Sequence, residues 1–190
     1  MSNSSNSAGI LRTRTHLFIL CGMFAALTAI CAQIALPLPF TPVPVTFGPL
    51  AVFMAGGILG ARFGALSQVV YILMGAVGLP VFAGFRAGVG VLAGPTGGYI
   101  VGYIAAACVV GLLCGRLKSS GMRAAIVLAA SMLVGHLACY ALGTLWFMYL
   151  TNTPLLASLG MCVFPFIPGD ALKILIASLL CARLRGFVAR

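Results

Sequence analysis

Apolar residues gather into six long segments, separated by short polar, proline-rich or glycine-rich stretches. The segments cover residues 17–36, 46–61, 63–79, 97–115, 122–150 and 162–182. A helix that crosses a membrane needs roughly 20 apolar residues, so most of these segments are long enough to span. The second is short, and only Ala61-Arg62 marks its junction with the third, so we expect it to be kinked or incomplete. The pattern predicts an all-α integral membrane protein, a six-helix transmembrane bundle.

Composition places almost the whole chain in one membrane domain. Of its 190 residues, 62% are hydrophobic and 6% are charged, and the mean hydropathy is +1.18. Soluble domains carry about 25% charged residues. We predict a polar cytoplasmic tail at 1–16, a single membrane domain at 17–185 and a cytoplasmic C-terminal tail at 186–190. The apolar run at 17–36 is long for a cleavable signal peptide, which favours a first span.

The positive charges predict an orientation, because Lys and Arg accumulate in cytoplasmic loops. With both termini cytoplasmic, nine of the 11 basic residues fall on the cytoplasmic side: Arg12, Arg14, Arg62, Arg116, Lys118, Arg123, Arg183, Arg185 and Arg190. The net charge of +10 then reflects topology and contact with anionic membrane lipid. A nucleic-acid partner is not expected, since the basic residues do not cluster with aromatic platforms. The pattern fits a multi-pass protein of a bacterial cell membrane, the inner membrane in a Gram-negative cell.

Cysteines and glycines favour helix packing. The seven cysteines show no Cys-x-x-Cys spacing and no nearby histidine, so we expect packing residues, no metal site and no cofactor. Glycines recur every four residues at 56, 60 and 64 and at 94, 98 and 102. This spacing lets helices approach closely in lipid, within one chain or by self-association. Ala25-x-x-x-Ala29 forms a similar smooth patch, for packing or for contact with another membrane subunit.

The single acidic residue of the chain, Asp170, lies three positions before Lys173 in the last apolar segment. A charge in hydrocarbon is costly, so such residues face protein or a cavity and mark binding sites. Spacing of i,i+3 places both side chains on one face of a helix. The pair therefore predicts a binding site, with an internal ion pair between helices as the alternative.

Arg86 stands alone in the glycine-rich connection between residues 82 and 99. The glycines there do not meet the spacing of a dinucleotide-binding loop, and no Gly-Lys-[Ser/Thr] follows. A lid over a cavity suits them better, with Thr96 and Tyr99 at the head of the fourth span. The guanidinium fork of Arg86 fits an incoming carboxylate, with a lipid phosphate as the alternative partner.

Five motifs, in order over residues of about 20 to 185, closely resemble BioY, the family of biotin-binding S components of energy-coupling-factor (ECF) vitamin importers. They are Ala25-Ala-Leu-Thr-Ala-Ile-Cys-Ala-Gln-Ile34, Leu36-Pro-Leu-Pro-Phe-Thr-Pro-Val-Pro-Val-Thr46, Gly78-Leu-Pro-Val-Phe-Ala-Gly84, Gly94-Pro-Thr-Gly-Gly-Tyr99 and Pro168-Gly-Asp-Ala-Leu-Lys173. Two places depart from the family pattern. Phe85 and Ala87 flank Arg86 where glycines are usual, and Phe47-Gly-Pro49 stands where polar residues are common.

The resemblance implies that the chain binds biotin. Ionised Asp170 accepts from the ureido N–H groups, Lys173 donates to the ureido carbonyl, and Arg86 takes the carboxylate. The ring system would pack on aromatic residues, with Phe40, Tyr71, Phe82 and Tyr99 as candidates, and Thr96 nearby. Gln33, Gln68, His136 and Tyr140 are expected to be hydrogen-bonded core residues, with titration of His136 as the alternative.

Energy for transport must come from elsewhere, because the chain has no Walker A sequence. The resemblance implies a transmembrane coupling subunit and ABC ATPases as partners, with Ala25 and Ala29 as the coupler contact. Three alternatives stay open: an S component for another vitamin, a solitary self-associating biotin transporter, and an integral-membrane enzyme. The shortage of ionisable groups argues against the enzyme.

Overall fold

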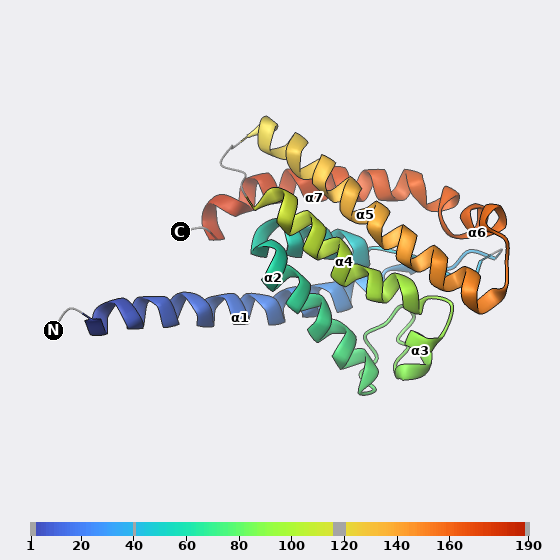
Figure 1. Ribbon diagram of the computed structural model, residues 1–190, viewed down its shortest axis with the longest axis horizontal. Helices are drawn as coiled ribbons and strands as arrows, with labels where there is room; N and C mark the ends of the chain where they lie inside the picture. Colours follow the sequence, from blue (N-terminus) through green and yellow to red (C-terminus); the bar gives the residue numbers. More distant parts are fainter. Residues whose placement is uncertain (1–2, 40, 116–120, 189–190) are drawn as a thin grey trace.

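The computed structural model describes residues 3–39, 41–115 and 121–188, and these are almost entirely helical (Figure 1). Its long helices are α1 (Asn3–Gln33), α2 (Gly48–Ala76), α4 (Gly97–Cys114), α5 (Met122–Thr151) and α7 (Ile167–Val188). Shorter elements are α3 (Val89–Ala93), α6 (Leu155–Cys162) and the 3-10 turn η1 (Phe164–Phe166). Two short antiparallel strands, β1 (Ala35–Leu36) and β2 (Val45–Thr46), link α1 to α2.

Helix α2 is bent back on itself at Gly60, whose backbone has φ 79° and ψ −177°. Eight residues of straight helix span about 12 Å, yet a Cβ built on Gly64 would lie 2.9 Å from Cα of Gly56. The two limbs therefore pack against each other, as Figure 1 shows for the teal and green-blue turns of α2. The predicted second and third segments are these two limbs, and the kink expected in the second segment lies near its end, at Gly60.

The first and last helices also begin or end at other residues than predicted. Helix α1 begins at Asn3, so the polar stretch before residue 17 continues the first span as one helix, and it ends at Gln33 before β1. The last predicted segment, 162–182, is interrupted near its start, because α6 ends at Cys162 and α7 begins only at Ile167. Pro165 and Pro168 lie at this interruption, where a continuous helix would lose backbone hydrogen bonds.

Helix α4 lies between α2 and α5 and makes close contacts with both through glycines (Figure 1). A Cβ on Gly102 would lie 2.9 Å from Sγ and 3.2 Å from Cα of Cys139 on α5. On the other side, a Cβ on Gly56 of α2 would lie 2.5 Å from the carbonyl oxygen of Ala107. The glycine spacing therefore serves packing within the chain, as one of its two interpretations predicted. Five of the seven cysteines, Cys21, Cys114, Cys139, Cys162 and Cys181, are buried among the helices, as expected of packing residues.

Gly102→Ala is expected to lower the free energy of unfolding by about 1–3 kcal/mol, because the added methyl group forces α4 and α5 apart. The measurement is the midpoint of thermal unfolding in detergent. Gly160→Ala is the matched control, since nothing lies within 4 Å of a Cβ at Gly160. An unchanged midpoint for Gly102→Ala would contradict the close approach of these helices.

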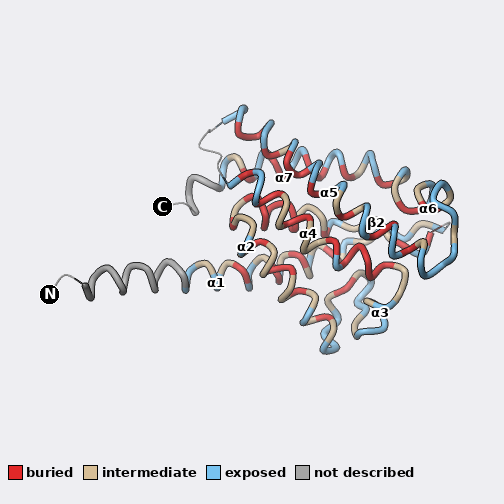
Figure 2. The backbone as a smooth tube through the Cα atoms, viewed as in Figure 1, coloured by how far each residue is buried: buried red, intermediate tan, exposed pale blue. Residues whose placement is uncertain are grey.

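Large apolar side chains cover the outside of the bundle. On α5, for example, Leu133, Leu137 and Leu145 are all exposed, and Figure 2 shows exposed turns alternating with buried ones along this helix. Within the described residues, five stretches are long and apolar enough to cross a membrane, with the two limbs of α2 counted as one. An apolar exterior of this kind suits lipid rather than water, and the protein is a multi-pass membrane protein.

The start of α1 and the end of α7 lie at the same end of the molecule, together with the bend of α2 and the start of α5 (Figure 1). Arg62 directly follows that bend region, and Arg123 lies in the first turn of α5. The connection that carries Arg86 lies beside α3 at the opposite end. The predicted cytoplasmic orientation of the termini stays a prediction. The side chains of Arg12, Arg14, Arg116, Lys118, Arg185 and Arg190 lie outside the described residues.

Candidate functional site

Two adjoining cavities of about 50 Å³ each lie at the end of the bundle that also holds the two strands. The polar cavity contains Asp170, Lys173, His136 and Tyr140. The aromatic cavity contains Tyr71, Phe82, Thr96 and Arg86. The wall between them is made of residues that line both cavities: Val43, Pro44, Thr46, Tyr99 and Tyr103. Seven of the eight predicted substrate-binding residues, all but Phe40, therefore line these two adjoining cavities, although they come from four separate parts of the sequence.

Asp170 is the centre of the polar cavity. Its Oδ1 accepts a hydrogen bond of 2.8 Å from Nζ of Lys173. Its Oδ2 lies 2.8 Å from Nε2 of His136 and accepts a hydrogen bond from the hydroxyl of Tyr140. Asp170, Lys173 and His136 are all buried, with 4%, 3% and 5% of their surface exposed. The structure thus confirms that the two charged residues share one helix face, and it also pairs them with each other.

Local chain chemistry explains how Asp170 reaches this place. The turn η1 contains Pro165, and Pro168 lies in the first turn of α7, where a missing N–H costs nothing. Asp170 is the acidic residue of that first turn. A carboxylate there is stabilised by the positive end of the helix dipole. The start of α7 therefore carries the carboxylate into the cavity and helps to stabilise it.

Both charged groups keep hydrogen-bonding capacity for a ligand. An ionised carboxylate offers about four lone-pair sites, and the described residues place one donor on Oδ1 and two on Oδ2. Lys173 has three N–H donors, and one of them goes to Asp170. Its ammonium also lies 5.8 Å from the centre of the Phe47 ring, a cation–π distance. A ligand with an N–H donor beside a carbonyl oxygen matches this pair.

His136 and Tyr140 are hydrogen-bonded as predicted, but their place in the site was not foreseen. They lie one turn apart on α5, with ring centres 4.2 Å apart, and both bond to Asp170. A polar i,i+4 pair in an apolar helix was the available signal, because such residues turn toward a cavity or another polar group. Thr46 and Tyr103, in the wall between the cavities, were also missed.

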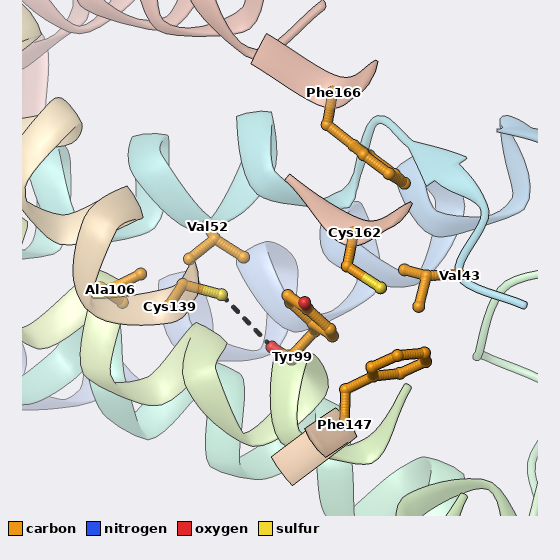
Figure 3. Packing of buried hydrophobic residues seen from close by; sticks show 9 residues of the cluster. Val43, Val52, Tyr99, Ala106, Cys139, Phe147, Cys162 and Phe166 are labelled. Atoms are coloured by element: carbon orange, nitrogen blue, oxygen red, sulfur yellow. Dashed lines mark hydrogen bonds between the residues drawn. The ribbon is translucent and has the colours of Figure 1, made fainter. Parts of the chain in front are cut away.

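The aromatic cavity is built from rings held edge to face. Tyr71 and Phe82, each 1% exposed, have ring centres 5.7 Å apart and planes at 86°. The Tyr71 hydroxyl donates to the carbonyl of Val81 at 3.3 Å. Tyr99 is hydrogen-bonded to Thr144 at 3.1 Å, and Figure 3 shows its ring beside Cys162, Val43 and Phe147 of the same buried cluster. These rings form apolar walls for a flat ligand. Phe40, another candidate, lies outside the described residues.

Arg86 ends a tight turn at the outer side of the aromatic cavity. The Phe82 N–H donates to the carbonyl of Arg86 at 3.1 Å, and Nε of Arg86 donates to the carbonyl of Ala83 at 3.0 Å. Arg86 also lines a third, outer cavity of about 460 Å³. Asp170 is the only acidic side chain in the sequence, and it is paired with Lys173. Arg86 therefore lies between the aromatic cavity and the outer cavity. It is a cation without an acidic side chain to pair with.

The BioY family matches residues 2–190 of the sequence. The chain belongs to the BioY family. "Biotin transporter BioY" of Thermotoga maritima is 37% identical over 164 residues, which are 86% of this chain and 92% of that protein. The protein of the same name in Rhodobacter capsulatus is 39% identical and covers 84% of this chain and 88% of its own length. These relatives are named as transporters. Membership of a transporter family excludes the alternative of an integral-membrane enzyme.

A crystal structure described as the S-component for biotin from an ECF-type ABC transporter has the same fold as this BioY-family chain. The TM-score is 0.82 at 28% sequence identity, over 98% of this chain and 95% of that one. The similarity confirms the predicted helical membrane fold and the family resemblance found in the five motifs. Phe47, which departs from the BioY pattern, has a contact that explains it. Its ring faces the ammonium group of Lys173, at a position where a polar side chain is common in the family.

The small residues of α1 are placed differently from the predicted BioY coupler contact. Ala25 is 1% exposed and packs in a core cluster with Tyr71 and Phe82, and Ala29 is half-buried against the same cluster. Ala25 therefore has no surface to offer another subunit. Exposed small residues of α1 lie instead at Gly22 and Ala26, each three positions before the corresponding predicted residue. Ala26 lines an apolar surface hollow of about 360 Å³ together with Met23, Phe24, Leu27 and Ile30.

Proposed function

We propose that this chain is a biotin-capturing membrane subunit, for which separate ECF coupling and ATPase subunits supply ATP-driven transport. The observation that carries the proposal is the buried Asp170–Lys173 pair at one end of an aromatic-walled site, with Arg86 at the other end. Biotin has the matching order of groups: a ureido ring, an apolar bicycle and a carboxylate on a flexible chain. The names of the relatives support this ligand.

In the proposed complex, the ureido N–H donates to Oδ1 of Asp170 and the ureido oxygen accepts from Lys173. His136 and Tyr140 occupy Oδ2, whereas Oδ1 bonds only to Lys173 among the described residues and keeps a lone pair for the ligand. The bicycle packs against Tyr99 and Tyr103, and the valerate chain passes through the aromatic cavity toward Arg86. A ligand of this size fills both cavities only if the wall between them moves. We therefore expect Tyr99 and its neighbours to change position on binding.

Equilibrium binding of labelled biotin to the detergent-purified full chain tests this proposal. We expect saturable binding that unlabelled biotin competes away and that thiamine and riboflavin do not affect. Competition by another vitamin alone would assign the chain a different ligand. Folded wild-type protein that binds no biotin would overturn the proposal.

The partner contact is proposed on the exposed face of α1 at Gly22 and Ala26, in place of Ala25 and Ala29. Small residues at i,i+4 let a second membrane helix approach closely, and the neighbouring side chains of this face are apolar. The partner proposed for this face of α1 is a membrane coupling subunit, since the solved protein of the same fold is a component of an ECF-type ABC transporter.

A further inference from the structure

The side chain of Gln33, the last residue of α1, ties that helix to the turn that carries Arg86. Its Nε2 lies 3.4 Å from the carbonyl of Pro80 and 3.2 Å from that of Phe82. Its Oε1 accepts a hydrogen bond of 2.9 Å from the backbone N–H of Phe85. Nε2 also lies 3.3 Å from the carbonyl of Ala29, one turn back on α1. One amide side chain thus contacts the backbone both at the start of the turn, at Pro80 and Phe82, and at its tip, at Phe85. The same side chain is also bonded to α1.

The turn needs such an anchor, because its own conformation is strained. Gly84 has φ 70°, and Phe85 has φ 56°, a left-handed conformation that bulky residues rarely adopt. The Phe85 side chain is 71% exposed, so packing does not hold it. Such a conformation persists only where surrounding contacts enforce it. The Gln33–Phe85 hydrogen bond acts directly on the strained residue.

The position of Arg86 depends on this turn. Arg86 lines both the aromatic cavity and the outer cavity, and Gln33 lines the outer cavity beside it. The hydrogen bond to Ala83 uses Nε of Arg86. Both terminal nitrogens of the fork are then available for the two oxygens of a carboxylate. A turn displaced from α1 would carry this fork away from the cavity.

We infer that Gln33 is a positioning residue for carboxylate recognition: it holds the 82–86 turn against α1 so that Arg86 faces the end of the ligand chain. The inference rests on the proposed function. It assigns Gln33 an effect on one end of the ligand only, because the ureido end binds at Asp170 and Lys173. A structural role in packing α1 would instead affect all ligands equally.

The test compares biotin with its neutral carboxamide, which lacks the carboxylate charge, on detergent-purified full-length protein. Gln33→Ala and Arg86→Ala are each expected to raise the Kd of biotin about tenfold and to leave that of the carboxamide within about twofold. In the Gln33→Ala/Arg86→Ala double variant, the loss for biotin should equal that of Arg86→Ala alone, because the two residues act through one contact.

Gln68→Ala is the matched control. Gln68 is a buried amide of α2 that, like Gln33, links α1 to another part of the chain, but its bond is to Thr28 and lies away from the turn. A packing defect there should change both Kd values by the same factor. An equal loss of both ligands in Gln33→Ala, or additive losses in the double variant, would overturn the inference while leaving the proposed function standing. Wild-type protein that binds neither ligand would overturn the proposed function, and this inference with it.

Discussion

Asp170→Asn is expected to weaken biotin binding by about two to four orders of magnitude. Removing one partner of a buried ion pair costs about 3–5 kcal/mol, and each 1.4 kcal/mol is a factor of ten in Kd. An asparagine keeps one acceptor oxygen where the carboxylate has two, and its amide N–H₂ would face Lys173, His136, Tyr140 or the ligand's own N–H. The Kd of labelled biotin, measured on protein that remains monodisperse in detergent, checks this expectation.

A charge-neutral double variant separates ligand recognition from a structural ion pair. Lys173→Met alone leaves the Asp170 carboxylate without its 2.8 Å ammonium partner, so binding should also be lost. The Asp170→Asn/Lys173→Met variant removes both charges of the pair together, so neither is left buried without the other, and its thermal stability should recover toward that of the wild type. If the pair served only to hold α7 against α5, through the bonds of Asp170 to His136 and Tyr140, binding would recover as well. We expect stability to recover and binding to stay lost.

Ala26→Trp is expected to abolish ATP-dependent biotin uptake while leaving the Kd of biotin within about twofold. Ala26 is exposed on α1, and an indole there would keep a second helix from approaching closely. Uptake of labelled biotin is measured in cells that also produce the coupling and ATPase subunits. Binding is measured on the purified variant.

Two further tryptophan variants test whether the loss of uptake is specific to the exposed face of α1. Ala141→Trp places the same ring at an exposed position of α5, and we expect it to spare both uptake and binding. Ala25→Trp inserts the ring into a site that is 1% exposed, so it should destabilise the fold and lose both activities. Normal uptake by Ala26→Trp would place the docking face elsewhere.

The sequence predicted the spans and the charged pair because both depend on local information. A long apolar segment identifies a membrane helix, and Asp170 and Lys173 are neighbours on one helix turn. The face of α1 could not be predicted in the same way. Gly22 and Ala26, as well as Ala25 and Ala29, have the spacing of a packing motif, and between residues 17 and 32 the helix is apolar on nearly every side. In lipid the hydrophobic effect does not distinguish the outer face from the inner one, so only the contacts with α2 decide.

The partners of Asp170 were missed for a different reason. His136 and Tyr140 lie 34 and 30 residues away from it along the chain, and nothing in their local sequence indicates which helix they face. Their convergence depends on how α5 and α7 pack, and the hydrogen bonds from Gln33 likewise depend on where the 82–86 turn lies. Tertiary geometry of this kind is fixed by the whole bundle.

The bend at Gly60 also decides a property of the whole chain, namely the parity of its membrane crossings. With α2 as a single straight rod, the chain would cross an odd number of times, and its two ends would emerge in different compartments. Because the rod folds back, we expect an even number of crossings. Reporter domains fused to Met1 and Arg190 should therefore sense the same compartment, whichever way the protein is inserted. The backbone conformation of one glycine, with φ 79°, is therefore expected to decide on which side of the membrane the later loops and the C-terminus lie.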